Sequence, residues 1–290
     1  MRQLENYLPH VVEDLHWVIK SPFLTRNLPE PDFRNHKGTN QLLKRLEENP
    51  EIILDDLALM KRHNLGSYFE TLVSFWLKNL PDVQIIAQNR QIRNEGNTIG
   101  ELDLVFLFND VYYHWELAVK FYANTDDTSQ ESCWVGPLKK DTLKRKFTRL
   151  FDHQLPMVNH AIKTLNLRPE LPVKSSPFVK GVLFHKRRSN TTDIKLPARV
   201  NPNCQKEIWL SVGELPRHFK NMPTHFAALP KLHWFSTNVY ADWQQLTHYS
   251  QIEKLVNLNE RPQLIAFGSS KHGSHPPLQI ARHFIMPDDW

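Results

Sequence analysis

Alternating apolar and polar side chains from residue 100 to residue 122 predict a β-hairpin. Two runs rich in Val, Leu, Phe, Tyr and Trp flank Asn109 and Asp110. This pair suits a two-residue turn, because both residues tolerate the positive φ angles that such a turn needs. A two-residue turn fixes the register of the hairpin, and by that register Asp103 lies directly opposite Glu116.

The alternation gives the hairpin two faces of different character, since successive side chains point to opposite sides of a strand. One face is apolar throughout and is predicted to be core: Leu102, Leu104, Phe106, Phe108, Val111, Tyr113, Trp115, Leu117, Val119 and Phe121. The other face gathers charged groups at the end away from the turn: Glu101, Asp103, Glu116 and Lys120.

Two opposed carboxylates repel each other unless a cation or a shared proton compensates. Mg²⁺ is a natural compensation, because it takes oxygen ligands and prefers one or two carboxylates together with a substrate phosphate. A nearby ammonium such as that of Lys120 can then orient or deprotonate an attacking water. The alternative is an exposed face with a Glu/Lys ladder, as many antiparallel sheets show.

Helices are predicted before the hairpin from apolar residues at helical spacing. Short amphipathic runs at residues 7–20, 42–46 and 52–60 indicate a helical N-terminal extension over residues 1–63. A stronger helix covers residues 65–80 and ends at Pro81, and residues 83–93 follow as a strand. Glu70 lies one step off the apolar stripe of that helix and either reaches toward the sheet or stays at a solvated rim.

The helix predicted from Asp141 onward carries the densest basic patch of the chain. Its apolar stripe continues to Gln154, which is either a hydrogen-bonded packing residue or a ligand. Six positive charges lie on the helix and its approach: Lys139, Lys140, Lys144, Arg145, Lys146 and Arg149. The patch is either a solvated helix face or a contact to phosphates of a nucleic acid.

The last 118 residues, 173–290, are predicted to complete an α/β sheet. Strands are expected at residues 178–185, 207–212, 232–236, 264–267 and 283–286, and a helix near residues 242–258. With the helical extension and a central core at residues 64–172, this gives three parts of one chain. A chain of 290 residues can bury a sizeable apolar interior.

The composition says more about the cellular compartment than about the function of the protein. The net charge of +5 and the pI near 9.1 are compatible with a polyanionic partner. Two cysteines, Cys133 and Cys204, are too few for a disulfide framework and fit a reducing compartment. The N-terminus lacks a signal peptide and no run reaches the length of a membrane span, so we expect a cytoplasmic protein with no membrane partner.

The predicted order of elements resembles the αβββαβ core of the PD-(D/E)XK nuclease-like superfamily. That order is helix with Glu70, strand, strand with Asp103, strand with Glu116 and Lys120, helix with Gln154, strand. Four segments, HWELAVKFY, WVGPLKKDTLKRKF, HQLP and RHFIMPDDW, look like the uncharacterised bacterial family called domain of unknown function 1853. This second resemblance spans nearly the whole chain.

The superfamily resemblance implies an α/β fold with a mixed central sheet around a restriction-endonuclease-like core. It also implies Mg²⁺ or Mn²⁺ held by Asp103 and Glu116, with Glu70 and Glu101 assisting. One departure is that the superfamily places lysine two positions after the second acid, where this chain has Ala118; its lysine is Lys120. Two functions follow: a metal-dependent nuclease, or a catalytically inactive module that binds nucleic acid or protein.

Overall fold

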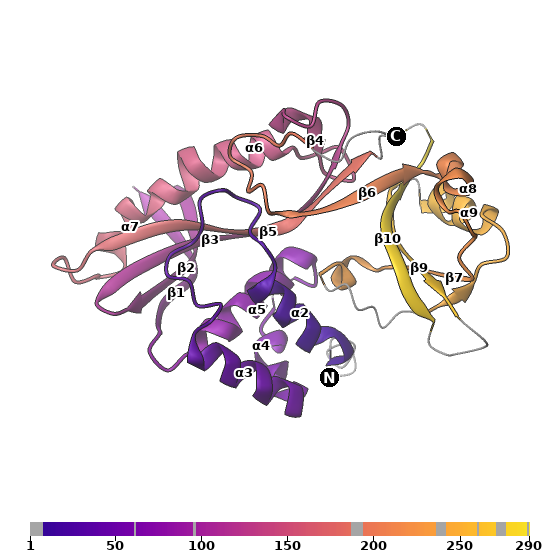
Figure 1. Cartoon of the computed structure of the whole chain (residues 1–290). Helices are drawn as coiled ribbons and strands as arrows, with labels where there is room; N and C mark the ends of the chain where they lie inside the picture. Colours follow the sequence, from indigo (N-terminus) through magenta and orange to yellow (C-terminus); the bar gives the residue numbers. More distant parts are fainter. Residues whose placement is uncertain are drawn as a thin grey trace. The chain divides into compact units, whose positions relative to one another are not determined.

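The computed structural model describes residues 8–60, 62–94, 97–186, 194–235, 242–259, 261–270, 277–288 and 290 (Figure 1). They form a mixed α/β fold with a ten-stranded sheet in the order β1-β2-β3-β5-β6-β10-β9-β7-β8, and β4 pairs with β3. The chain divides into two compact units. The first comprises Met1–Lys120, Lys144–Gly181 and Ala198–Cys204, and the second Phe121–Leu143, Val182–Pro197 and Gln205–Trp290.

Helices of the first unit begin with α2 (Leu8–Lys20), α3 (Lys37–Glu48), the 3₁₀ turn η1 (Pro50–Ile53), α4 (Leu54–Ala58) and α5 (Leu65–Lys78). Asn64 caps α5 by accepting a hydrogen bond from the Ser67 N–H at 3.0 Å, which satisfies one donor of the first turn. The predicted start of the first helix at Tyr7 lies outside the described residues. The helical character predicted for this part of the chain is confirmed.

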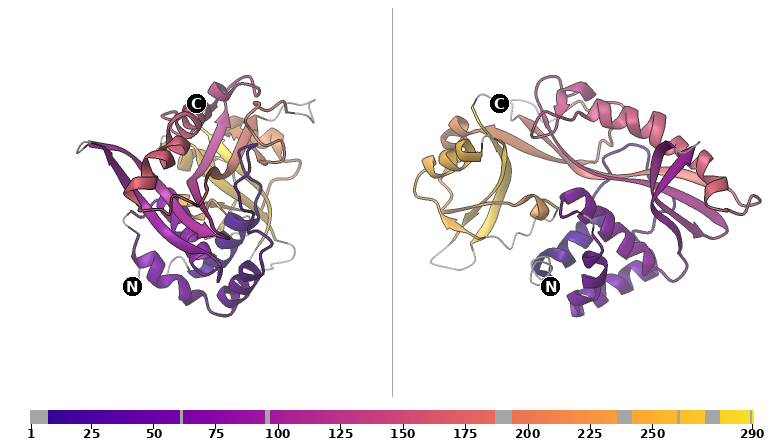
Figure 2. Two further views of the ribbon diagram at one scale, coloured as in Figure 1. Left: turned by 90° about the vertical axis from the view of Figure 1, so that its left-hand side faces the viewer. Right: turned by 180° about the vertical axis from the view of Figure 1, so that it is seen from behind.

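Strands β1 (Gln84–Asn94), β2 (Asn97–Phe108) and β3 (Val111–Asn124) follow α5. Asn109 and Asp110 form the turn between β2 and β3 with φ angles of 48° and 56°, so the predicted two-residue turn is confirmed. The register is also confirmed, because Phe108 pairs with Val111 and Leu104 with Trp115. Figures 1 and 2 show α2–α5 on one side of these strands and the segment from α6 to α7 on the other.

The apolar face of the hairpin is largely buried, as predicted. On it, Trp115 stacks on Phe178 with ring centroids 4.7 Å apart. The opposite face is more enclosed than its polar residues suggested: His114 and Glu116 are fully buried. At Glu116 the hairpin therefore does not form the solvent-exposed Glu/Lys ladder that was the alternative.

After the hairpin come η2 (Glu131–Cys133), β4 (Trp134–Val135), α6 (Leu143–Thr148), a π-helical turn η3 (Arg149–Gln154), η4 (Leu155–Met157), α7 (Val158–Thr164) and β5 (Val173–Lys186). Gly181 on β5 has φ 153°, and a Cβ there would lie 1.8 Å from the Lys120 carbonyl oxygen of β3. Glycine at this position thus permits a close approach of two backbones beside Lys120.

The second unit contains β6 (Gln205–Ser211), η5 (Val212–Glu214), α8 (Leu215–His218), β7 (His225–Ala228), η6 (Lys231–His233), β8 (Gln244–Gln245), α9 (Ser250–Asn259), β9 (Gln263–Ser269) and β10 (Leu278–Met286). β6 runs parallel to β10, whereas β9 is antiparallel to both β10 and β7. An ion pair of 2.6 Å between Arg282 and Glu207 joins neighbouring strands β10 and β6.

Of the elements predicted in this unit, the strand at residues 232–236 is wrong, and the helix near residues 242–258 is present as α9 but starts later than predicted. Residues 231–233 form a 3₁₀ turn in place of the strand expected at 232–236, where Ser236 lies outside the described residues. After the turn the Trp234 indole N–H donates a hydrogen bond to the Leu229 carbonyl at 3.0 Å, and Trp234 and Phe235 are buried. The helix expected near residue 242 begins at Ser250, because Gln244 and Gln245 pair with β7.

Within the described part of the chain, no helix is long and apolar enough to cross a membrane.

Candidate functional site

The Asp103 and Glu116 carboxyl groups form a hydrogen bond with each other where the β2–β3 ladder ends. Leu104 and Trp115 are the last paired residues of this ladder. Beyond them the Asp103 carboxylate accepts a hydrogen bond from the Leu117 N–H at 2.8 Å. A side chain therefore continues the strand pairing, and the two carboxyl groups predicted to share a face do lie together.

His114 and Gln154 orient the buried Glu116 carboxyl group, and Ser175 holds His114. Its Oε1 lies 3.0 Å from His114 Nε2, and its Oε2 accepts a hydrogen bond of 2.5 Å from Gln154 Nε2. On its other side the His114 ring lies 2.8 Å from the Ser175 hydroxyl. Burial lowers the pKa of His114 to about 4, so the ring is neutral at pH 7 and holds Glu116 in place without adding charge.

Lys146 brings positive charge to the carboxyl pair from α6. Its ammonium donates a hydrogen bond of 3.1 Å to Gln154 Oε1, the same amide that donates to Glu116. Burial lowers the pKa of Lys146, and the positive charge of Lys120 lowers it further. Two lysines, on α6 and β3, therefore act electrostatically on one site, whereas the sequence predicts only Lys120 there.

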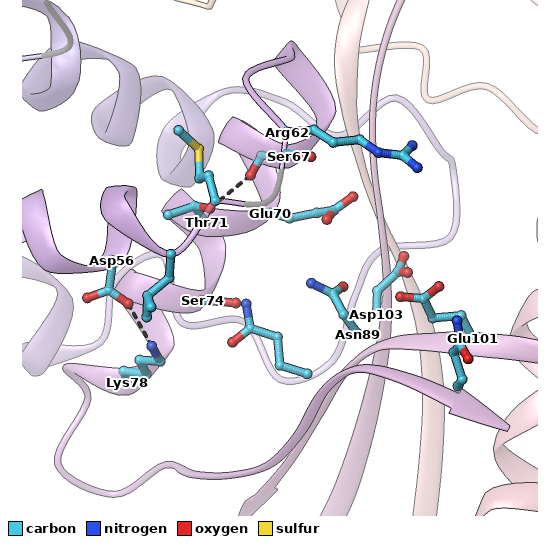
Figure 3. A pocket seen from close by; sticks show the side chains of 14 residues that line it. Asp56, Arg62, Ser67, Glu70, Thr71, Ser74, Lys78, Asn89, Glu101 and Asp103 are labelled. Carbon is cyan, nitrogen blue, oxygen red and sulfur yellow. Dashed lines mark hydrogen bonds and ion pairs between the residues drawn. The ribbon is translucent and has the colours of Figure 1, made fainter. Parts of the chain in front are cut away.

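Glu70 on α5 and Glu101 on β2 line a cavity together with Asp103 (Figure 3). Burial raises the pKa of Glu70 to about 7, with further contributions from the negative charges of Asp103 and Glu101. Glu70 therefore reaches toward the strands and does not stay at a solvated rim of the helix. Glu101 is exposed at the edge of the cavity.

Glu70, Glu101, Asp103 and Glu116 form a carboxyl cluster whose oxygen atoms suit a hard cation. Burial raises the pKa of Asp103 to about 7, and the Glu116 carboxylate raises it further. Burial also raises the pKa of Glu116 to about 7, against the opposing charge of Lys146. In the described part of the chain no three His, Cys, Asp or Glu side chains form a ready-made metal cage. The hydrogen-bonded carboxyl groups of Asp103 and Glu116 nevertheless fit Mg²⁺, which keeps several waters and needs few protein ligands.

The basic residues predicted to contact nucleic acid fall into separate groups. Lys144, Arg145 and Arg149 are exposed on α6 and at the start of the π-helical turn. Lys139 and Lys140 are exposed in the second compact unit, where the Lys139 ammonium lies 4.6 Å from the Trp290 ring centroid. Of the six, Lys146 alone has its ammonium hydrogen-bonded within the carboxyl cluster among the described contacts.

His114 and Lys146 lie beside the carboxyl pair although neither was predicted there. The sequence contains a signal for each of them. His114 alternates with Glu116 and so shares its face of β3. Lys146 lies three residues after Leu143 and four before Leu150, both buried, which puts it beside the apolar stripe of its helix. Spacing alone therefore separates Lys146 from its exposed neighbours Lys144 and Arg145.

The family model for a domain of unknown function (DUF1853) matches residues 13–286, and the chain belongs to this family. No curated protein and no solved structure matches the chain.

Proposed function

We propose that this member of the DUF1853 family is a Mg²⁺- or Mn²⁺-dependent nuclease, a phosphodiesterase that acts on nucleic acid. The observation that carries the proposal is the hydrogen-bonded pair of carboxyl groups of Asp103 and Glu116. The pKa values of both are raised to about 7 beside the Lys146 ammonium. Perturbed carboxyl groups next to a lysine at the edge of a cavity are typical of catalytic sites.

In this proposal Asp103 and Glu116 hold the metal, and Glu70 and Glu101 assist through water. When bound, the metal supplies a Lewis acid that neutralises charge on the phosphate and lowers the pKa of a water. Lys120, or Lys146 in its place, orients or deprotonates the attacking water. Gln154 fixes the Glu116 carboxylate through its 2.5 Å hydrogen bond.

The order of elements also supports the PD-(D/E)XK resemblance. α5, β1, β2, β3, α6 and β5 follow one another as helix, three strands, helix and strand, and β1-β2-β3-β5 are neighbours in the sheet. β4, short helical turns and α7 also lie between β3 and β5. The proposed core therefore has its acids on β2 and β3 and its assisting glutamate on the preceding helix.

A second candidate is a catalytically inactive module that binds nucleic acid or protein through the same fold. It is favoured by Ala118, a residue only 8% exposed at the position where the superfamily has its lysine. In this alternative the carboxyl pair is a structural remnant that shares a proton.

Cleavage by the wild type and by Asp103→Asn tests the proposal. We expect the wild type to cleave single-stranded or duplex DNA or RNA with Mg²⁺ or Mn²⁺, and Asp103→Asn to lose the activity because one metal ligand becomes neutral. Calorimetric titration should show metal binding by the wild type and its loss in the variant. Equal metal binding by both proteins, or none by either, contradicts the metal site.

Charge reversal on α6 tests the nucleic-acid surface. In Lys144→Glu with Arg145→Glu, binding should weaken and its dependence on salt should flatten. Each lost phosphate contact lowers the slope of log affinity against log salt by about 0.9 on duplex DNA or about 0.7 on single strands. The matched control is Lys44→Glu with Arg45→Glu, an exposed Lys-Arg pair on α3. Equal slopes in the two double variants contradict a phosphate role for α6.

A further inference from the structure

The cavity beside the carboxyl cluster has a volume of about 820 Å³, the size of a pocket for a small organic ligand. Figure 3 shows residues of α5 on one side and of the strands on the other. Six of its lining residues carry hydroxyls or amides, next to the apolar Leu59 and Met60 and the charged groups: Ser67, Thr71, Ser74, Gln88, Asn89 and Gln91.

The charges around this cavity disfavour a phosphate as its main occupant. Glu70, Glu101 and Asp103 line one part of it and repel anions. Lys78, one of two cations among the described lining residues, is held by Asp56 at 2.6 Å. The other cation, Arg62, is exposed, and the six hydroxyl and amide side chains offer neutral donors and acceptors, which suit a neutral ligand with hydrogen-bonding edges.

Ser74 points to a missing hydrogen-bond partner in the cavity. It is 2% exposed, and its hydroxyl has no hydrogen-bond partner among the described residues. Its neighbour Thr71, by contrast, donates to the Ser67 carbonyl at 2.9 Å. Buried polar groups are nearly always hydrogen-bonded, so an unsatisfied one that lines a cavity indicates a bound ligand or water.

Asn89 shows backbone strain at the same place. Its φ is 49°, in the left-handed region, although it lies within β1. The pairs on either side, Gln88 with Leu104 and Arg90 with Leu102, put it opposite Asp103. Figure 3 shows the Asn89 amide beside Asp103. Asn tolerates this conformation better than most residues, and such strain clusters at binding and catalytic sites.

From these observations we infer that the cavity receives one unpaired nucleobase of the substrate, next to the phosphate that reacts at Asp103 and Glu116. The inference rests on the proposed function and adds a substrate class to it. Nucleobases are neutral and present donors and acceptors on their edges, which match Ser74, Asn89 and the glutamines. A base inside a duplex has its edge paired, so the substrate has an unpaired or extruded nucleotide at the cleavage point.

Two variants test the inference without loss of the fold. Ser74→Ala removes an unsatisfied hydroxyl, and Asn89→Gly places the residue that tolerates positive φ. Both proteins should therefore melt at or above the wild-type temperature. With Ca²⁺ as the metal, each should bind a fluorescein-labelled single-stranded DNA or RNA about tenfold more weakly, the effect of one lost hydrogen bond. Binding of Ca²⁺ itself should not change.

Matched controls remove the same features elsewhere. Ser21→Ala deletes another buried hydroxyl without a described partner, and Asn109→Gly replaces a residue with φ 48° in the hairpin turn. Both should bind single strands as the wild type does. The wild type should also prefer these strands to the same sequence as a blunt duplex.

The outcomes separate this inference from the function on which it rests. If the wild type binds metal and cleaves nucleic acid, but Ser74→Ala and Asn89→Gly bind single strands like their controls, the base pocket is wrong and the nuclease stands. If the wild type binds no DNA or RNA with any divalent metal, the nuclease is wrong and the base pocket with it.

Discussion

In metal-free buffer at pH 8, Asp103→Asn should be more stable to urea than the wild type by about 2–4 kcal/mol. The pKa of Asp103 rises from 3.8 to about 7, mainly because the carboxyl group is buried. Each pKa unit corresponds to about 1.4 kcal/mol of preference for the neutral form. The variant is neutral at every pH, and its amide oxygen can still accept the hydrogen bond from the Leu117 N–H.

The direction of the pH dependence follows from the raised pKa. Below about pH 4 Asp103 is protonated in both the folded and the unfolded state. The stability of the wild type is then highest as far as this group is concerned. As the pH rises toward 7 the unfolded chain loses its proton first, so folding becomes less favourable until Asp103 ionises in the folded state too. The wild type should therefore lose stability from about pH 4 to about pH 7, and Asp103→Asn should lose less.

Mg²⁺ and a control variant complete this test. At pH 8 saturating Mg²⁺ should stabilise the wild type, because a ligand that binds only the folded state adds its binding free energy to stability. It should not stabilise Asp103→Asn. Asp152→Asn, a change at an exposed carboxylate, should follow the wild type. If Asp103→Asn is less stable than the wild type at pH 8, ionised Asp103 does not destabilise the folded protein, and there is no repulsion for a cation to compensate.

The position of this carboxyl pair could be predicted because a hairpin is local. Asn109 and Asp110 specify a two-residue turn, and that turn fixes which residues face each other as far as Leu104 and Trp115. The helical spacing around Glu70 is local in the same way. In both cases a few neighbouring residues contain the information that sets the geometry.

Other parts depended on packing between segments far apart in the sequence. The sequence predicts one regular helix through Gln154, but residues 149–154 form a π-helical turn, in which the Leu155 N–H donates to the Leu150 carbonyl. Gln154 is the last residue of this turn and reaches Glu116 across 38 positions of sequence. The cavity joins α5, β1 and β2, and the unsatisfied hydroxyl of Ser74 has no signal in the sequence.

Lys146→Met should lower the rate of cleavage by about 10²–10⁴, the usual contribution of a general acid or base. The Lys146 ammonium is half-buried, is held by Gln154 and acts on both Asp103 and Glu116. Its lowered pKa makes the neutral amine more accessible near neutral pH, as a base requires. Lys144→Met, on the exposed side of the same helix, is the matched control and should keep the rate of cleavage near that of the wild type.

The two lysines of the site can be told apart by pH profiles, because Lys120 is a like charge that lowers the pKa of Lys146. If Lys146 is the base, Lys120→Ala should leave metal affinity intact, raise the pKa of Lys146 and move the rising limb of the rate to higher pH. Lys146→Arg should then fail as Lys146→Met does, since arginine keeps the charge but does not release its proton. If instead Lys120→Ala loses at least a hundredfold at every pH while Lys146→Met stays active, Lys120 is the catalytic lysine, and Lys146 serves to neutralise the carboxyl pair.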